Sequence, residues 1–543
     1  MKKITLLCAL FACLCVNAQW VTDTAVNTLV AESASDDAKS MGTSDGKTFV
    51  VFWKSVAAPT NYELRVQLLD VNGNQQLGID GMLVSNAIPM STFTYVWKLV
   101  IDKNDNLYIC VTGSGTGNPA FVFKIDPDGN SVWENGLSLG SGLVPTVLPL
   151  ENGDVIVSYW PGSGKAKMQR FTAEGTAVWA SPTEAIGASA TSATIPGNLF
   201  ELSDGSYTMV FHQKFNFGVG SNLYAQKYSQ LDGTSTWALP TAVSNKGTVY
   251  NTTYSSAQDG DVIYYGYSGA TGLRYDGYVQ RINSDGTTPW GINGMDFDTN
   301  TTSYEIDTKI AFEQGSGYVW AIARYTPSTQ DSYGEYVQKF DKITGVRQFT
   351  DNAKEVFEID ASSRSHIGDL FLQDDEPLFL IKTGMDNGVS PVTLSGVLLT
   401  PDGDMAGEGP IPVATFAASK GRVSLNRPAD GQATAVFTEQ KQAGQTRIYA
   451  QNFTTALLAN KTFGSVSGIK VYPNPTNGFF TVNSSTQLES VNVYNLSGQL
   501  IVCEKVGTTE ANINTESWSN GIYLIDIQTE EGKKTTIKLV KTN

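Results

Sequence analysis

The chain has 543 residues, a formal net charge of -16 and a sequence pI of about 4.7. A surface this acidic repels phosphate backbones, so we expect no nucleic-acid partner. Glycine is abundant, aromatic residues make up 10% and charged residues only 17% of the chain, and helical heptads are absent, which together predict an all-β protein.

The N-terminus carries the pattern of a secretory leader. Two lysines follow Met1, and an apolar run over residues 4–16 leads to Ala18. A short basic start, an apolar core and a small residue before the cut predict a signal peptide at 1–18 that engages the Sec translocon. A lipoprotein leader ending before Cys13 is an alternative that fits less well. The apolar run is too short to span a bilayer, and no later segment is apolar enough, so no transmembrane segment is predicted.

Residues 19–456 read as one repeated unit of strand, Asp-Gly-type turn, strand, loop, strand, second turn and aromatic residue. A glutamine marks the third strand of most units, with a spacing of about 55 residues, which is near the period of propeller blades. This first marker series is Gln67, Phe123, Gln169, Gln226, Gln280, Gln338, Val397 and Gln451. A second marker, mostly tryptophan, follows each: Leu77, Trp133, Trp179, Trp237, Trp290, Phe349 and Gly407.

The two ends of this repeat complement each other. Each unit should contain two hairpins, and turn dipeptides mark the first hairpin of eight units but the second hairpin of only seven. Trp20 is in phase with the second marker series, so residues 20–26 read as the missing last strand. Because open sheet edges are a liability, we expect this strand to complete the last unit. The prediction is an eight-bladed β-propeller over 19–456, or seven blades if residues 364–416 are an irregular insertion.

The recurring residues are interpreted as structural, since a residue that recurs at one strand position in every unit usually packs. We expect the tryptophans to fill the space between adjacent sheets and the glutamines to bond a neighbouring loop or blade backbone. Function on a propeller lies in what does not repeat. Three loops rich in Tyr, Asp and Asn have the composition of recognition surfaces, and their predicted ligand-binding residues are Phe217, Arg274, Tyr275, Asp276, Asp331 and Tyr333.

Motifs for catalysis and metal binding are weak throughout the chain. The only two histidines, His212 and His366, are far apart in sequence, and no cysteine pair has zinc spacing. The segment 102–106 resembles half of a calcium loop but lacks its glycine and distal glutamate, so turn chemistry explains it better. We therefore predict no catalytic residue, no metal site and no cofactor. Outside the leader only Cys110 and Cys503 remain, and both are expected to be buried free thiols.

The last 75 or so residues carry several motifs in a fixed order. They run from Tyr472-Pro473-Asn474-Pro475 to Gly478, then through Asn520-Gly521-Ile522-Tyr523, and end on Lys538 to Lys541. Order and spacing resemble the type A C-terminal sorting domain of the type IX secretion system. The resemblance implies that the secretion machinery recognises Tyr472, Pro473, Asn474, Pro475, Gly478, Asn520, Gly521, Tyr523, Lys538 and Lys541. Short alternating strands between Pro and Gly turns predict a small Ig-like β-sandwich at 469–543, after a linker at 457–468.

The predicted protein is exported through the Sec and type IX systems to the outer cell surface or the medium. We expect the passenger to be a non-enzymatic binding or adhesion module for a glycan or a protein. One alternative is a carbohydrate-active enzyme with paired carboxylates at the channel mouth, since such pairs leave no local signature. Another alternative is a scaffold of a surface or motility layer.

Overall fold

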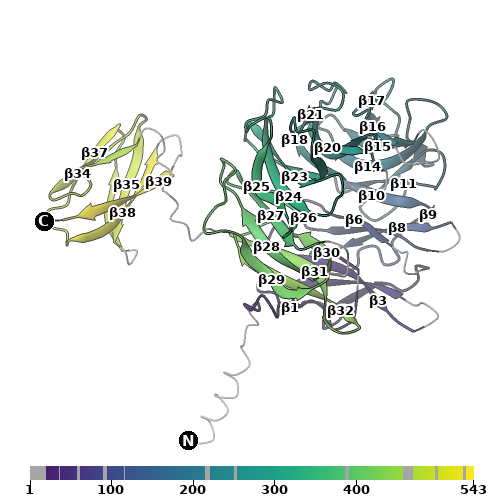
Figure 1. Ribbon diagram of the computed structural model, residues 1–543, viewed down its shortest axis with the longest axis horizontal. Helices are drawn as coiled ribbons and strands as arrows, with labels where there is room; N and C mark the ends of the chain where they lie inside the picture. The colour runs from purple at the N-terminus through teal and green to yellow at the C-terminus, as the bar shows by residue number, and fades with distance from the viewer. Residues whose placement is uncertain are drawn as a thin grey trace, which may run out of the picture. The chain divides into compact units, whose positions relative to one another are not determined.

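The computed structural model describes residues 20–35, 37–57, 62–89, 95–114, 117–214, 221–249, 254–385, 391–455, 469–495, 499–529 and 534–542 (Figure 1). The expected leader at 1–18, the expected linker at 457–468 and Phe217 lie outside these residues. The chain divides into two compact units, residues 1–455 and 456–543, and each is described by itself.

The first unit is built from small antiparallel four-stranded sheets, and no helix occurs among its described residues. Seven of the eight sheets are formed by four consecutive strands, and the eighth takes one strand from the N-terminus. Residues 364–416, which the sequence left open as an irregular insertion, lie within one of the regular sheets. The sheets are β2–β5 (Ala38–Gly42, Thr48–Ser55, Tyr62–Leu69, Met82–Ser85), β6–β9 (Tyr95–Ile101, Leu107–Thr112, Pro119–Ile125, Leu137–Ser141), β10–β13 (Leu143–Pro149, Val155–Trp160, Lys167–Phe171, Thr183–Glu184), β14–β17 (Ala193–Glu201, Ser206–Lys214, Ser221–Ser229, Thr241–Ala242), β18–β21 (Ser255–Asp259, Val262–Thr271, Arg274–Ile282, Met295–Asp296), β22–β25 (Tyr304–Ala311, Tyr318–Thr326, Tyr333–Asp341, Lys354–Asp360), β26–β29 (Arg364–Gln373, Glu376–Thr383, Val392–Leu398, Ile411–Ala418) and β30–β32 with β1 (Lys420–Leu425, Gln432–Gln442, Gln445–Thr454, Thr28–Leu29).

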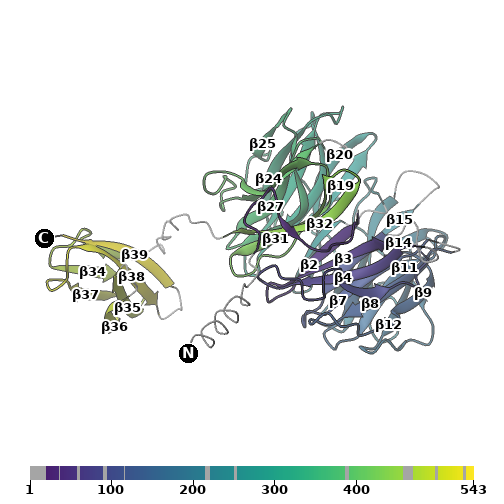
Figure 2. The ribbon, with the colours of Figure 1, turned by 90° about the horizontal axis from the view of Figure 1, so that it is seen from below.

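The N-terminal segment joins the last sheet, but not through the residues that the sequence indicated. The pairing strand is β1, in which Thr28 and Leu29 pair with β32, whereas the expected strand was 20–26. A turn precedes it, because the amides of Val26 and Asn27 both donate to the carbonyl of Asp23. Figure 2 shows the N-terminal strands β2 and β3 beside β31 and β32.

The recurring tryptophans link neighbouring sheets. The indole nitrogen of Trp133 donates to the carbonyl of Ala173 in the next sheet at 3.0 Å, and Trp20 makes the same kind of bond to Val71 at 2.9 Å. Trp20 thus ties the N-terminal segment to the first sheet. Buried apolar side chains of adjacent sheets form shared cores between them, as with Phe49 and Ile109.

The recurring glutamines make the same side-chain bonds to backbone in successive sheets. The side-chain amide of Gln226 donates to the carbonyl of Trp237 at 3.2 Å, and its oxygen accepts from the amide of Lys227 at 2.8 Å. Gln67, Gln169, Gln280 and Gln338 repeat this pattern. The principal bond therefore holds the connection from the third to the fourth strand. Gln280 also donates to the carbonyl of Val243, the residue after β17 of the preceding sheet, at 3.1 Å, which agrees with the expected bond to a neighbouring loop or blade backbone.

The first strands of successive sheets contact one another, and β30 contacts β2. Between β14 and β18 the contact is a hydrogen bond from the Asn198 side chain to the hydroxyl of Ser256. Six of these strands, β6, β10, β14, β22, β26 and β30, contain register shifts. Several residues at the shifts have positive φ, including Asp307 at 56° and Arg422 at 50°. Because a bulge re-aims the side chains around it, these strands position the polar residues considered below.

The second unit contains a three-stranded and a four-stranded sheet. The strands, in hydrogen-bonded order, are β33, β34 and β37 (Lys470–Tyr472, Phe479–Asn483, Glu510–Asn514), and β36, β35, β38 and β39 (Leu500–Lys505, Leu488–Asn495, Gly521–Thr529, Lys534–Lys541). Buried side chains from both sheets, among them Phe480 and Ile525, form a single core. The expectation of two buried thiols is wrong for Cys503, which is exposed on the edge strand β36, whereas Cys110 is buried.

Candidate functional site

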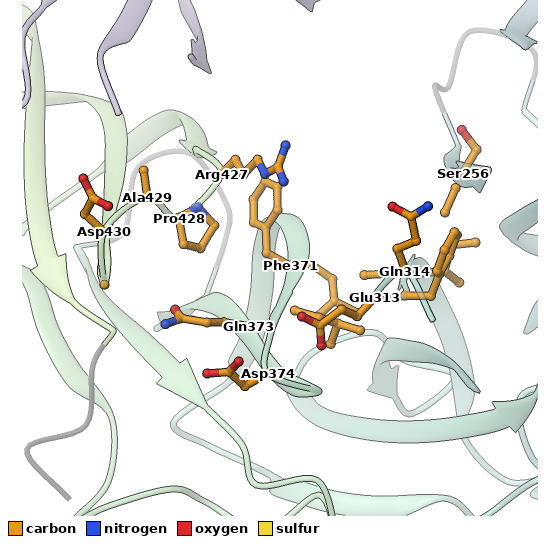
Figure 3. Close-up of a pocket in the computed structure, with 17 residues that line it drawn as sticks. Ser256, Glu313, Gln314, Phe371, Gln373, Asp374, Arg427, Pro428, Ala429 and Asp430 are labelled. Carbon is orange, nitrogen blue, oxygen red and sulfur yellow. The ribbon is translucent and has the colours of Figure 1, made fainter. Parts of the chain in front are cut away.

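Two cavities lie against the first strands of the passenger sheets. The larger, which we call the basic cavity, has a volume of about 940 Å³ and is lined by β2, β6, β26, β30 and adjoining turns. Its charged lining residues are Lys39, Lys98, Lys103, Arg422 and Arg427 against Asp102, Asp105 and Asp369. The second cavity, of about 730 Å³, is lined by β18, β22, β26 and the β30–β31 turn, and carries Glu313, Asp374, Asp430 and Arg427 (Figure 3). The two cavities therefore differ in charge and share Arg427.

Lys98 is the cation that β6 presents to the basic cavity. It follows the register shift between Val96 and Lys98. Its ammonium group is 3.3 Å from the hydroxyl of Thr146 and 3.5 Å from the amide oxygen of Asn198, both on neighbouring first strands. Among the described residues, no carboxylate lies within ion-pair distance of the Lys98 ammonium group. Burial lowers the pKa of Lys98 to about 8, because the charged form loses hydration that two neutral oxygens replace incompletely.

Arg427 is the second cation of the basic cavity without an ion-pair partner among the residues that the structure describes. Arg427 and Phe371 line both cavities, and Figure 3 shows the Arg427 guanidinium beside Phe371 in the second one. Other cations of the wall are engaged: Arg422 pairs with Asp37 at 2.9 Å, and Lys103 pairs with Glu151. Lys98 and Arg427 thus leave positive charge available to a ligand.

Three of the predicted ligand-binding residues lie at the start of β20 rather than in a loop. Arg274, Tyr275 and Asp276 continue the β19–β20 hairpin, and Tyr275 pairs with Ala270. The Arg274 guanidinium contacts the carboxylate of Asp276 at 2.5 Å and donates to the carbonyl of Asn300 at 2.6 Å. The structure therefore brings Arg274 and Asp276 together, but it engages them with each other.

Asp276 belongs to a group of acidic residues between two sheets, which we call the four-carboxylate cluster: Asp276, Asp296, Asp298 and Glu305. One oxygen each of Asp296, Asp298 and Glu305 lie within 4.8 Å of one another. Burial, reinforced by Asp276 and Asp298, raises the pKa of Asp296 to about 6. Burial, together with the charge of Asp298, raises the pKa of Glu305 well above its usual range. Sequence reasoning missed this cluster because its members come from β20, β21, β22 and the loop between the last two.

Tyr333 and Asp331 lie near the β23–β24 connection. Tyr333 is the first residue of β24, and the guanidinium of Arg324 lies over its ring at 5.3 Å from the centroid. Asp331 is exposed in the preceding loop, where its carboxylate accepts from the hydroxyl of Ser332 at 3.4 Å. Tyr333 is therefore held by a cation, while Asp331 remains a surface residue.

His366, for which the sequence indicated no partner, lies between two acidic side chains. His366 Nδ1 is 2.8 Å from Glu335, and its Nε2 is 3.6 Å from Asp307. His366 and Glu335 are fully buried, whereas the Asp307 side chain is 40% exposed. Burial alone would raise the pKa of Asp307, but Lys309, His366 and Arg324 hold it far below its ordinary value. So acidic a carboxylate is a poor proton acceptor at neutral pH, and these side chains are better suited to holding β22, β24 and β26 together.

In the second unit, the first and last sorting motifs bind each other. The Asn474 side chain donates to the carbonyl of Lys538 at 2.6 Å and accepts from the amide of Val540 at 2.9 Å. Lys541 is buried, and its ammonium group donates to the carbonyl of Asn477 at 3.0 Å.

The predicted sorting residues differ in their accessibility. The exposed ones are Tyr472, Pro473, Asn474, Pro475, Asn520, Gly521 and Lys538. Gly478 is half-buried, and Tyr523 is buried with its hydroxyl donating to the carbonyl of Ser519 at 2.8 Å. Tyr523 and Lys541 are therefore placed to support the unit from within.

Residues 470–542 match the family of secretion system C-terminal sorting domains. The protein is accordingly exported by type IX secretion to the cell surface or the extracellular space. No helix long and apolar enough to cross a membrane is found in the described part of the chain. No curated protein sequence is significantly similar to the chain.

Among solved structures, the passenger is similar to propeller-like proteins. A PL25 ulvan lyase, a polysaccharide lyase, matches with a TM-score of 0.42 and 12% identity over 68% of this chain and 94% of its own. Prolyl oligopeptidase B from Galerina marginata matches with a TM-score of 0.40 and 10% identity over 79% and 56%. An α-L-arabinanase from Penicillium chrysogenum matches with a TM-score of 0.35 and 12% identity over 59% and 99%. Because none of these scores reaches 0.5, none of the activities is carried over to this chain.

Proposed function

We propose that this is an exported binding protein whose passenger, an eight-bladed β-propeller closed by its N-terminal strand, binds an acidic saccharide in the basic cavity. The second unit is its Ig-like sorting domain, and the Sec translocon and the type IX machinery are its export partners. The observation that carries the binding proposal is the pair of cations, Lys98 and Arg427, that line one cavity without a carboxylate within ion-pair distance of either among the described residues.

The size of the basic cavity favours a small acidic group over a folded protein partner. Ligand pockets for small molecules commonly have volumes of about 300–1,000 Å³, and the cavity of about 940 Å³ falls in that range. A carboxylate or sulfate entering it would gain charge-assisted hydrogen bonds from Lys98 and Arg427. Ser40 and Asn426 line the same cavity and add polar groups of the kind that sugar hydroxyls use.

The four-carboxylate cluster gives little support to the glycosidase alternative. Glycosidases that retain configuration separate their two carboxyl groups by about 5–5.5 Å, and inverting enzymes by about 6.5–9.5 Å. Three members of this cluster have oxygens within 4.8 Å of one another, and both Asp298 and Glu305 are buried. A substrate could not reach both acids without displacing protein.

The proposal is tested by calorimetric titration of the full chain with acidic oligosaccharides, uronate-containing and sulfated, and with neutral oligosaccharides of equal length. We expect binding to an acidic set, and a loss of at least tenfold in affinity in Lys98→Met, because a buried charge-assisted bond is removed. Lys165→Met, in the β11–β12 connection away from both cavities, is the matched control. Equal binding of neutral and acidic sugars, or unchanged affinity in Lys98→Met, would overturn the proposal. Cleaved product would establish the enzymatic alternative.

A further inference from the structure

The four-carboxylate cluster joins two consecutive sheets of the passenger. Asp276 is the third residue of β20 and Asp296 ends β21, while Glu305 lies at the start of β22 in the next sheet. The loop between β21 and β22 contains Asp298 and is the only covalent connection between these two sheets. Anything bound by the cluster therefore fastens one sheet to the next.

The cluster is constructed by specific bonds rather than by chance proximity of surface acids. The carbonyls of Asp296 and Asp298 accept hydrogen bonds from the guanidinium of Arg347 at 3.0 and 3.2 Å, which fixes the backbone of the loop. Asp298 accepts from the amide of Asn300 at 2.7 Å and from the hydroxyl of Tyr325. Outer partners of this kind orient metal-ligating carboxylates in proteins.

An independent observation points to a missing ligand. Glu305 is fully buried, and its Oε2 accepts from the amide of Gly277 at 3.0 Å, but its Oε1 has no hydrogen-bond donor. The nearest cation is Arg274, whose Nη2 is 3.5 Å away and already donates to the carbonyl of Asn300. A buried carboxylate oxygen without a donor is costly, and a cation would relieve that cost.

We infer that Asp296, Asp298 and Glu305, with Asp276 beside them, bind a calcium ion that fastens the sheet β18–β21 to the sheet β22–β25. The ligand set consists of oxygen atoms alone, which suits a hard cation and not zinc. Calcium takes oxygen ligands at about 2.3–2.6 Å in flexible geometries, so oxygens up to 4.8 Å apart can share one ion. Magnesium takes oxygen ligands at about 2.0–2.1 Å in near-octahedral geometry, so its ligand oxygens would have to lie closer together.

The experiment uses the full chain stripped with a chelator and then titrated with calcium. We expect a rise in melting temperature of several degrees at millimolar calcium, because the ion binds only the folded state. Terbium, used as a calcium probe, should become luminescent through Tyr325, whose hydroxyl contacts Asp298, and calcium should quench the signal by displacement. Both responses should disappear in Glu305→Gln and in Asp296→Asn, and should persist in Asp331→Asn, an exposed carboxylate of the β23–β24 loop.

Glu305→Gln keeps an oxygen that can accept from the amide of Gly277 and places no charge in the cluster, so the metal-free variant should melt no lower than the stripped parent protein. Asp296→Asn, at a half-buried position, provides a second variant if the first does not fold. A flat melting temperature and no terbium signal in the parent chain would overturn the inference and leave a shared proton as the occupant. A calcium response retained in both variants would overturn it as well. The sugar-binding proposal stands or falls separately, because Lys98 is in a different cavity.

Discussion

The two units are both made of short antiparallel strands, but their recognisable residues act differently. In the passenger, the marker residues make the same structural bond in successive sheets: Gln226 bonds a carbonyl eleven residues away in its own sheet, and Trp133 bonds a carbonyl of the adjacent sheet. In the second unit, motifs at opposite ends of the sequence bind each other, as Asn474 does with the backbone of β39. A residue that recurs in every unit thus indicates the repeated fold, whereas a motif that occurs once indicates one particular contact.

Deleting residues 469–543 should have the largest effect. Because this unit carries the match to the sorting family, we expect the passenger to remain in the periplasm while it still folds. Immunoblots of periplasm and medium, with protease resistance as the folding control, would check this. Normal release of the truncated passenger would contradict the assignment of the second unit as the sorting domain.

Replacing a marker tryptophan tests whether the passenger markers are structural. Trp133 is 5% exposed and bonds the next sheet, so Trp133→Ala should lower the free energy of unfolding by about 3–5 kcal/mol. Trp518→Ala, at a half-buried position of the second unit, should cost less. Denaturant titration of the full chain measures both. A loss below about 1 kcal/mol for Trp133→Ala would remove the structural interpretation.

The contact between the first sorting motif and β39 should be weaker but still measurable. Asn474→Ala removes two hydrogen bonds and should destabilise the second unit by about 1–3 kcal/mol. Faster hydrogen exchange of the Val540 amide, relative to Asn520→Ala as control, is the expected signature. If exchange is unchanged, Asn474 does not hold β39.

The pH dependence of ligand binding should give the smallest effect and would sharpen the passenger side of the comparison. The pKa of Lys98 is lowered to about 8 by burial, so its charge is lost as the pH rises through that value. Affinity for an acidic saccharide should be constant below pH 7 and fall up to about tenfold per pH unit above 8. Between about pH 8 and 10.5 the unfolded lysine binds more protons than the folded one, so this group makes stability rise with pH. Calorimetry in Lys98→Met should show no such decline.

The sequence by itself determined the all-β class, the repeat and the export route. Turn dipeptides, strand alternation and marker residues such as Gln226 act over a few residues, so they are visible in one dimension. The phase of Trp20 already placed the N-terminus with the last unit, although the strand itself proved to be Thr28–Leu29 because of the turn at Asp23.

Only the tertiary structure decided which polar side chains share a site. Lys98 and Arg427 are more than three hundred residues apart, and both line one cavity because the first strands of different sheets face it. Glu305 meets Asp296 across two sheets, and His366 meets Glu335 in the same way. Burial was decided in the same way: the predicted sorting residues Tyr523 and Lys541 lie inside the second unit. Such contacts depend on how sheets close around each other, which no local pattern encodes.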